Sequence, residues 1–182
     1  ILEDKQRPQN FMNPCFLLRG RIYQTLGYSE SAFFKKAKEA FEQAIRAASD
    51  GRQKSLAYRE MAELDFVLEE WDAARQAIVS AQRFSHTADE QAESLLLEAD
   101  LGILHNDFNS AKAIADSIFR TFPGTLTWTE NVFRRELLQT VPPDFHEKWS
   151  LSWKYVCQNR REDLAKQWQA DSLAKPEPLL LK

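Results

Sequence analysis

The hydrophobic pattern of this chain repeats with a period of 37 residues. A small side chain returns at this spacing three times, at Ala37, Ala74 and Ala111, and an aromatic side chain lies three residues before each. Apolar side chains follow each alanine at four and seven residues, spacings that share one face of an α-helix. A period of this length indicates an array of helical units that bury a core between neighbours.

A second apolar stripe precedes the alanine of the middle unit. Its members follow one another at steps of one, three and four residues: Tyr58, Met61, Ala62 and Phe66. The pattern predicts a helix over residues 53–68, a tight turn at Glu69 and Glu70, and an antiparallel helix through Ala74. The third unit likewise predicts a helix over residues 87–105. These two stretches contain no Pro and one Gly.

The residues resemble the tetratricopeptide repeat (TPR). That motif has a large residue, Leu-Gly and Tyr on a first helix, then small, large and small residues on a second helix. The second unit matches with Tyr58, Met61-Ala62, Trp71, Ala74, Ile78 and Ala81, and the third with Leu95, Glu98-Ala99, Gly102, Phe108, Ala111, Ala115, Ile118 and Pro123. The first matches with Gly20, Tyr23 and Gly27 and, after about five extra residues near 28–32, with Ala37, Phe41 and Ala44. A generic array of helical hairpins is the alternative.

The resemblance implies an all-α fold, a right-handed superhelix of antiparallel helix pairs with a carboxyl-terminal capping helix. We expect an extension over residues 1–12, three repeats over 13–124, a degenerate fourth unit with the cap over 125–171, and a tail or linker over 172–182. Because the period exceeds the family's usual 34 residues, we expect first helices nearly one turn longer. The low content of 5 Gly in 182 residues favours helices over sheet.

The carboxyl-terminal part departs from the repeat. Lys148 stands where the next alanine is expected, among several large aromatic side chains that include Trp149, Trp153 and Trp168. We predict a helix over residues 126–140, a break at Val141-Pro142-Pro143, Asp144 as a helix N-cap, and one long helix or two over 145–170 that close the array. We expect these aromatic residues to serve packing.

No pattern in the sequence indicates catalysis, so we expect a protein that is not an enzyme and binds no cofactor or metal. The chain has no phosphate-binding Gly-rich loop, no Gly-x-Ser-x-Gly and no His-Glu-x-x-His. His86, His105 and His146 are too scattered for a metal site. Cys15 and Cys157 lack metal-ligand or redox spacing, and we expect buried free thiols.

Charge is unevenly distributed along the chain. Residues 1–54 carry 10 Lys and Arg against 6 Asp and Glu, residues 55–110 carry 3 against 12, and residues 111–182 carry 11 against 9. The acidic middle units disfavour nucleic acid as a partner and favour a basic or amphipathic protein segment. A face that merely solubilises the protein is the alternative.

The resemblance also implies where a partner would bind, because first helices line the concave groove of TPR arrays. The family's groove positions fall here on Leu17, Arg21 and Gln24, on Leu56, Arg59, Glu63 and Phe66, and on Glu93, Leu96, Asp100 and Ile103. For Phe66, core and groove are equally open. The cationic clamp by which some family members bind carboxyl-terminal acids is not reproduced at these positions, which disfavours a co-chaperone of that kind.

The function we expect is a non-enzymatic scaffold for protein-protein interaction, either an adaptor or an assembly or secretion chaperone. It would bind a peptide or helix of a partner in the groove. The alternative is a regulatory or oligomerising TPR domain of a larger protein, and self-association is left open. No apolar run is long enough to span a membrane, and we expect a cytoplasmic protein. Because the chain does not begin with Met, an earlier removed signal is also open.

Overall fold

The computed structural model describes residues 12–174, and all regular structure in that part of the chain is helical. The elements in chain order are α1 (Met12–Gly27), α2 (Ala32–Ala47), α3 (Gly51–Leu68), α4 (Trp71–Phe84), α5 (Ala88–Leu104), α6 (Phe108–Thr121), α7 (Trp128–Thr140), the short 3-10 helix η2 (Pro143–Phe145), α8 (His146–Cys157) and α9 (Arg161–Ala174).

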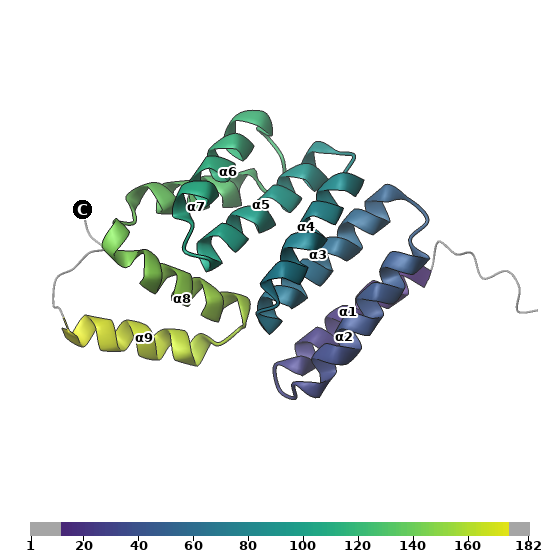
Figure 1. Ribbon diagram of the computed structural model, residues 1–182, viewed down its shortest axis with the longest axis horizontal. Helices are drawn as coiled ribbons and strands as arrows, with labels where there is room; N and C mark the ends of the chain where they lie inside the picture. Colours follow the sequence, from purple (N-terminus) through teal and green to yellow (C-terminus); the bar gives the residue numbers. More distant parts are fainter. Residues whose placement is uncertain (1–11, 175–182) are drawn as a thin grey trace, which may run out of the picture.

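The first six helices form three hairpins that stack side by side (Figure 1). The second helix of each hairpin also packs on the first helix of the next, since α2 contacts α3, α4 contacts α5, and α6 contacts α7. The first helices contact one another in turn, α1 with α3 and α3 with α5. The prediction of an all-α, repeat-like fold of adjacent helix pairs is therefore confirmed.

Local capping sets the helix boundaries. The Asp50 carboxylate accepts a hydrogen bond of 2.8 Å from the backbone N–H of Gln53 at the start of α3. Thr87 and Glu90 form a reciprocal capping box at the start of α5. Glu69, in left-handed conformation with φ 61°, follows α3 and turns the chain within two residues into α4. In the first hairpin the turn covers residues 28–31, two residues more than the turn between α3 and α4, and the other extra residues lie in the ends of α1 and α2.

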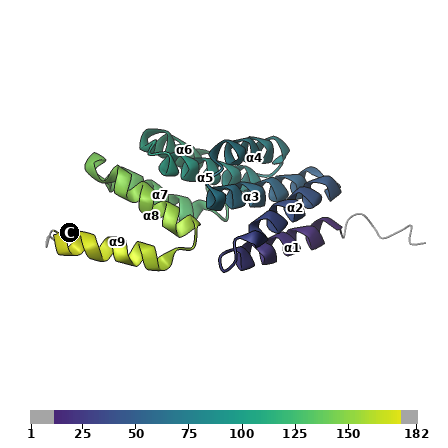
Figure 2. The same cartoon turned by 60° about the horizontal axis from the view of Figure 1, so that its bottom comes forward.

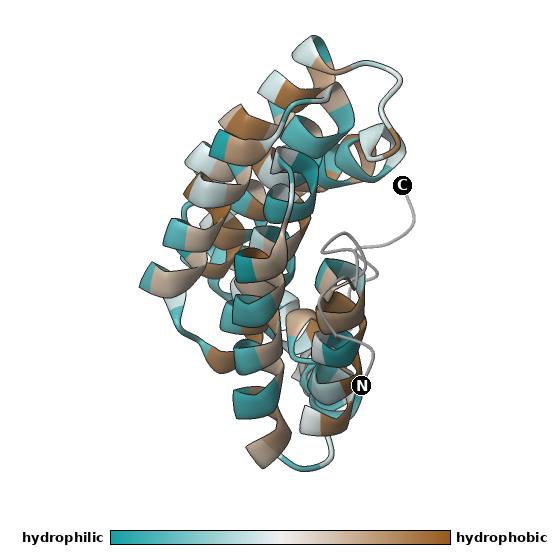
Figure 3. Cartoon of the chain, turned by 90° about the vertical axis from the view of Figure 1, so that its right-hand side faces the viewer, coloured by the Kyte–Doolittle hydropathy of each residue, from teal (hydrophilic) through white to brown (hydrophobic). Residues whose placement is uncertain are grey.

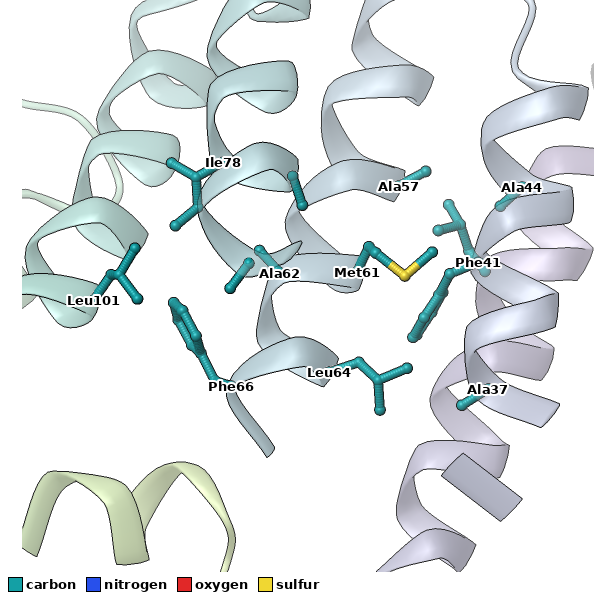
Figure 4. Close-up of a cluster of buried hydrophobic side chains, with 13 residues drawn as sticks. Ala37, Phe41, Ala44, Ala57, Met61, Ala62, Leu64, Phe66, Ile78 and Leu101 are labelled. Carbon is teal, nitrogen blue, oxygen red and sulfur yellow. The ribbon is translucent and has the colours of Figure 1, made fainter. Parts of the chain in front are cut away.

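The repeating alanines lie at the contacts between helices. Ala37, Ala74 and Ala111 are completely buried. A side chain larger than a methyl group at these positions would hold the two helices of a hairpin apart. Figure 4 shows the central cluster, in which Phe41 of α2 faces the side chains of α3 and Phe66 lies beside Leu101. With 3% of its surface exposed, Phe66 belongs to this core, and its ring edge also reaches the groove described below.

The carboxyl-terminal helices contact the middle of the array as well as its end. The structure has two helices, α8 and α9, over the stretch for which the sequence left one or two open. The main neighbours of α8 are α5, α3 and α9, so α8 returns toward the middle units, and the elements trace an arc from α1 to α9 (Figure 2). As expected, its Trp149 and Trp153 pack, here against a cluster that includes Ile103 and Leu138.

Two details of the sequence prediction need correction. Asp144 is not a helix N-cap, because it lies inside the 3-10 helix that starts at Pro143. The residue directly before α8 is Phe145. Cys15 is exposed rather than buried, since it lies on the outer face of α1, whereas Cys157 is half-buried. Both cysteines are free thiols.

The helices visible in Figure 3, which faces the end formed by α1 and α2, carry both hydrophobic and hydrophilic residues. Among residues 12–174 no helix is both long and apolar enough to cross a membrane. The expected amino-terminal extension lies outside the described residues up to residue 11, and so does the expected tail from residue 175 onward.

Candidate functional site

The first helices of the units enclose a groove of about 480 Å³. Its walls come from α1, α3, α5 and α7, and Cys157 at the end of α8 borders it. Eight of the eleven side chains that the TPR resemblance places in a groove line it: Gln24, Leu56, Arg59, Glu63, Phe66, Glu93, Leu96 and Asp100. Residues spaced four and seven apart on α3 and α5 face this side because they share one helix face.

The remaining predicted residues lie elsewhere. Arg21 of α1 stands at the rim, where its guanidinium forms an ion pair with the groove residue Glu60. Ile103 is not in the groove, because the aromatic side chains of α8 cover that turn of α5 and bury Ile103 together with Phe108. Leu17 belongs to the central core.

Most charged side chains of the groove are paired within the protein. Arg59 forms an ion pair with Glu93, which links α3 to α5. Arg134 of α7 reaches Glu130 on its own helix at 2.8 Å. The groove lining still carries five acids against two arginines, so the groove stays acidic although most of these acids have partners.

Asp100 lines the groove, as the resemblance implies, but its carboxylate is buried. It is 7% exposed and accepts two hydrogen bonds from Arg134, of 2.8 Å from Nε and 3.0 Å from Nη2. Burial raises the pKa of Asp100 above its ordinary range, and the Arg134 guanidinium acts in the opposite direction. Asp100 therefore joins α5 to α7 and is not available to a partner.

Glu63 is the groove acid without a counter-ion among the described residues. It lies on α3 between Arg59 and Phe66, and its side chain is open to solvent. Although the side chain is open on one side, the groove walls displace part of the bulk water around the carboxylate and Glu60 adds like charge. These effects outweigh the opposite effect of the nearby Arg21 and Arg59 and raise the pKa of Glu63 to about 7. A cation entering the groove would offset both penalties.

Sequence reasoning missed the contribution of α7 and α8 to this site. Glu130 and Arg134 of α7 line the groove. The repeat period could have predicted the place of Glu130, because it follows Glu93 by 37 residues. Cys157 has no repeat equivalent, because α8 arrives from outside the pattern. Burial raises the pKa of the Cys157 thiol to about 12, which keeps it protonated near neutral pH.

A tether fixes α8 beside the groove. Lys154 donates a hydrogen bond of 2.6 Å to the Glu69 carboxylate, and Gln158 donates to the same carboxylate at 3.0 Å. Both contacts lower the pKa of Glu69. The turn between α3 and α4 thereby holds the carboxyl-terminal part of the array in place.

The fold and the groove define a helical-repeat protein with a concave inner surface. Within residues 12–174 no three His, Cys, Asp or Glu side chains are grouped as ligands for a metal ion. Comparison with protein-family models, with curated proteins and with solved structures finds no significant match. Functional arguments for this chain therefore depend on its own groove and surfaces.

Proposed function

We propose that this chain is a TPR-like scaffold for protein-protein interaction and that its groove binds a partner segment with a Lys or Arg between apolar side chains. The observation that carries the proposal is Glu63, an unpaired carboxylate in a groove whose other acids have partners. An unpaired charge in a cleft is costly, and a partner cation would compensate it.

The surroundings of Glu63 define the rest of the partner segment. The half-buried Leu56 lines the same groove, and Phe66 and Leu96 border it with the small exposed parts of their side chains. The volume of about 480 Å³ falls within the range of ligand-binding clefts. A short extended or helical segment that presents one cation and two or three apolar side chains matches this arrangement.

The test is a selection of peptides from a displayed random library on the immobilised chain. Enriched sequences should combine Lys or Arg with apolar residues. Their affinity should fall about tenfold or more for Glu63→Gln, because a hydrogen bond to a charged group contributes roughly 1.5–3 kcal/mol. Glu63→Gln preserves the shape of the side chain, and circular dichroism verifies that the variant is folded.

The matched control is Glu39→Gln. Glu39 is an exposed acid on α2 and does not line the groove, so this variant makes the same charge change away from the site. It should bind the selected peptides as the unmodified chain does. Enriched peptides without a cation, or equal losses for both variants, would contradict the proposal.

A further inference from the structure

The outer face of α1 carries an exposed apolar stripe. Leu18, Ile22 and Leu26 follow one another at steps of four residues and are 60%, 50% and 43% exposed. At 100° per residue they share one face of the helix. We call these three residues the α1 stripe. It lies apart from the groove, since none of the three lines it.

The equivalent face of the next first helices is covered. Gly20 of α1 and Ala62 of α3 hold the same place in their repeats, as does Ala99 of α5. The residue two positions later is Ile22 in α1, Leu64 in α3 and Leu101 in α5.

Leu64 is completely buried and Leu101 is 3% exposed, because a preceding second helix covers each. In Figure 4 Leu64 lies beside Ala37 of α2, and Leu101 beside Ile78 of α4. The main helix contacts of α1 in the described part of the chain are with α2 and α3. At Ile22 the stripe therefore corresponds to the residue of α3 that α2 covers, but none of the main neighbours of α1 covers it, at the end that Figure 3 faces.

The charges beside the stripe select its occupant. On a helical wheel Arg19 flanks one side of the α1 stripe and Arg21 the other, and α1 contains no Asp or Glu. Arg19 donates to the amide oxygen of Gln43, so it has no acidic partner among the described residues. Arg21 is paired with Glu60, so Arg19 is the cation beside the stripe that remains for an occupant. Two copies docked stripe to stripe would offer Arg19 no acid from either α1, which disfavours a homodimer.

We infer that the α1 stripe is a docking surface for one amphipathic helix of a partner protein, with aliphatic residues along one face and acidic residues beside them. The aliphatic face covers Leu18, Ile22 and Leu26 as α2 covers α3, and an acid pairs with Arg19. This is a second interaction surface beside the groove, and it has the opposite charge preference.

The probe is a pair of designed helical peptides of 16 residues. Both carry Leu on one face; one has Glu at the flanking positions and its twin has Lys there. The Glu peptide should bind the chain at least tenfold more tightly than the twin. Ile22→Ser should weaken its binding at least tenfold, and Arg19→Glu should reverse the preference between the two peptides. Both altered residues are exposed, so the variants should stay folded, as circular dichroism verifies.

The thiol of Cys15 gives a local readout. Cys15 is exposed and falls within the α1 stripe on the helical wheel, whereas the Cys157 thiol is half-buried with its pKa raised to about 12, so a maleimide labels Cys15 first. The bound Glu peptide should slow this labelling, and Glu63→Gln should leave its binding unchanged. Equal binding of both peptides, no protection of Cys15, or a dimer of the chain that Ile22→Ser dissociates would overturn the inference.

Discussion

Replacing Gly20 with alanine tests how closely α1 packs on α2. A Cβ atom at residue 20 would lie 2.5 Å from Cδ1 and 2.9 Å from Cζ of the Phe41 ring, and closer still to Cε1. Ordinary carbon contacts are about 3.5–4.0 Å. Phe41 is completely buried, so the ring has no free space to enter.

The size of the effect follows from two opposing contributions. Overpacking of this kind costs roughly 1–3 kcal/mol, and three clashing ring atoms place Gly20→Ala at the upper end. Alanine is about 1 kcal/mol better than glycine inside a helix, which offsets part of the loss. We expect Gly20→Ala to lower the free energy of unfolding by about 1–2 kcal/mol.

The second unit provides the compensating change. At the corresponding places it has Ala62 and Ile78, a larger residue opposite a smaller one. In a Phe41→Ile background Gly20→Ala should therefore become neutral or stabilise the chain by up to about 1 kcal/mol. The coupling in this double-mutant cycle should be about 1–3 kcal/mol, because the two side chains share one space.

Urea unfolding followed by far-UV circular dichroism and by tryptophan fluorescence measures the four free energies. Coincident transitions from the two signals verify that unfolding is a single step for each variant. A stabilising Gly20→Ala in the unmodified background would refute the packing argument. So would a coupling below about 0.5 kcal/mol, since independent sites add within that range.

Three other changes probe the groove and the repeat contacts. Glu63→Gln should be more stable than the unmodified chain, because the pKa of Glu63 in the folded state is raised to about 7. The difference in the free energy of unfolding should grow as pH rises from about 4.5 to 7 and reach about 1 kcal/mol after allowance for solvent access. Unfolding measurements across this pH range give the difference. Arg134→Ala should cost about 3–5 kcal/mol at pH 8 by leaving Asp100 unpaired, and less at pH 5, where Asp100 can take up a proton; an equal loss at both pH values would contradict this. Ala74→Trp should cost about 1–3 kcal/mol or more by overpacking α4 on α3, and an unchanged melting temperature would contradict the assignment of Ala74 to this contact.

The repeat pattern predicted the fold because its signal is local. Ala37, Ala74 and Ala111 must be small wherever two helices cross closely, so their spacing reports the architecture directly. The TPR resemblance placed Glu63 and Glu93 at groove positions, and both line the groove of the structure.

What the sequence could not predict depends on contacts between distant elements. The burial of Asp100 requires Arg134, 34 residues away, and nothing in the local pattern distinguishes it from a surface acid. Ile103 is covered because α8 turns back over α5, a course set by tertiary packing after Pro142 rather than by the repeat. The exposure of Cys15 follows from its place on the terminal helix of the described array.

The tether between α8 and Glu69 changes how the array unfolds. Repeat arrays are built mainly from contacts between neighbouring units, so their ends can open independently of the middle. Lys154 and Gln158 reach the Glu69 carboxylate across 85 and 89 residues of sequence. The last helices and the second unit must therefore lose this connection together. Together with the packing of α8 on α3 and α5, this connection should make the carboxyl-terminal end open together with the middle units more than in a simple repeat array.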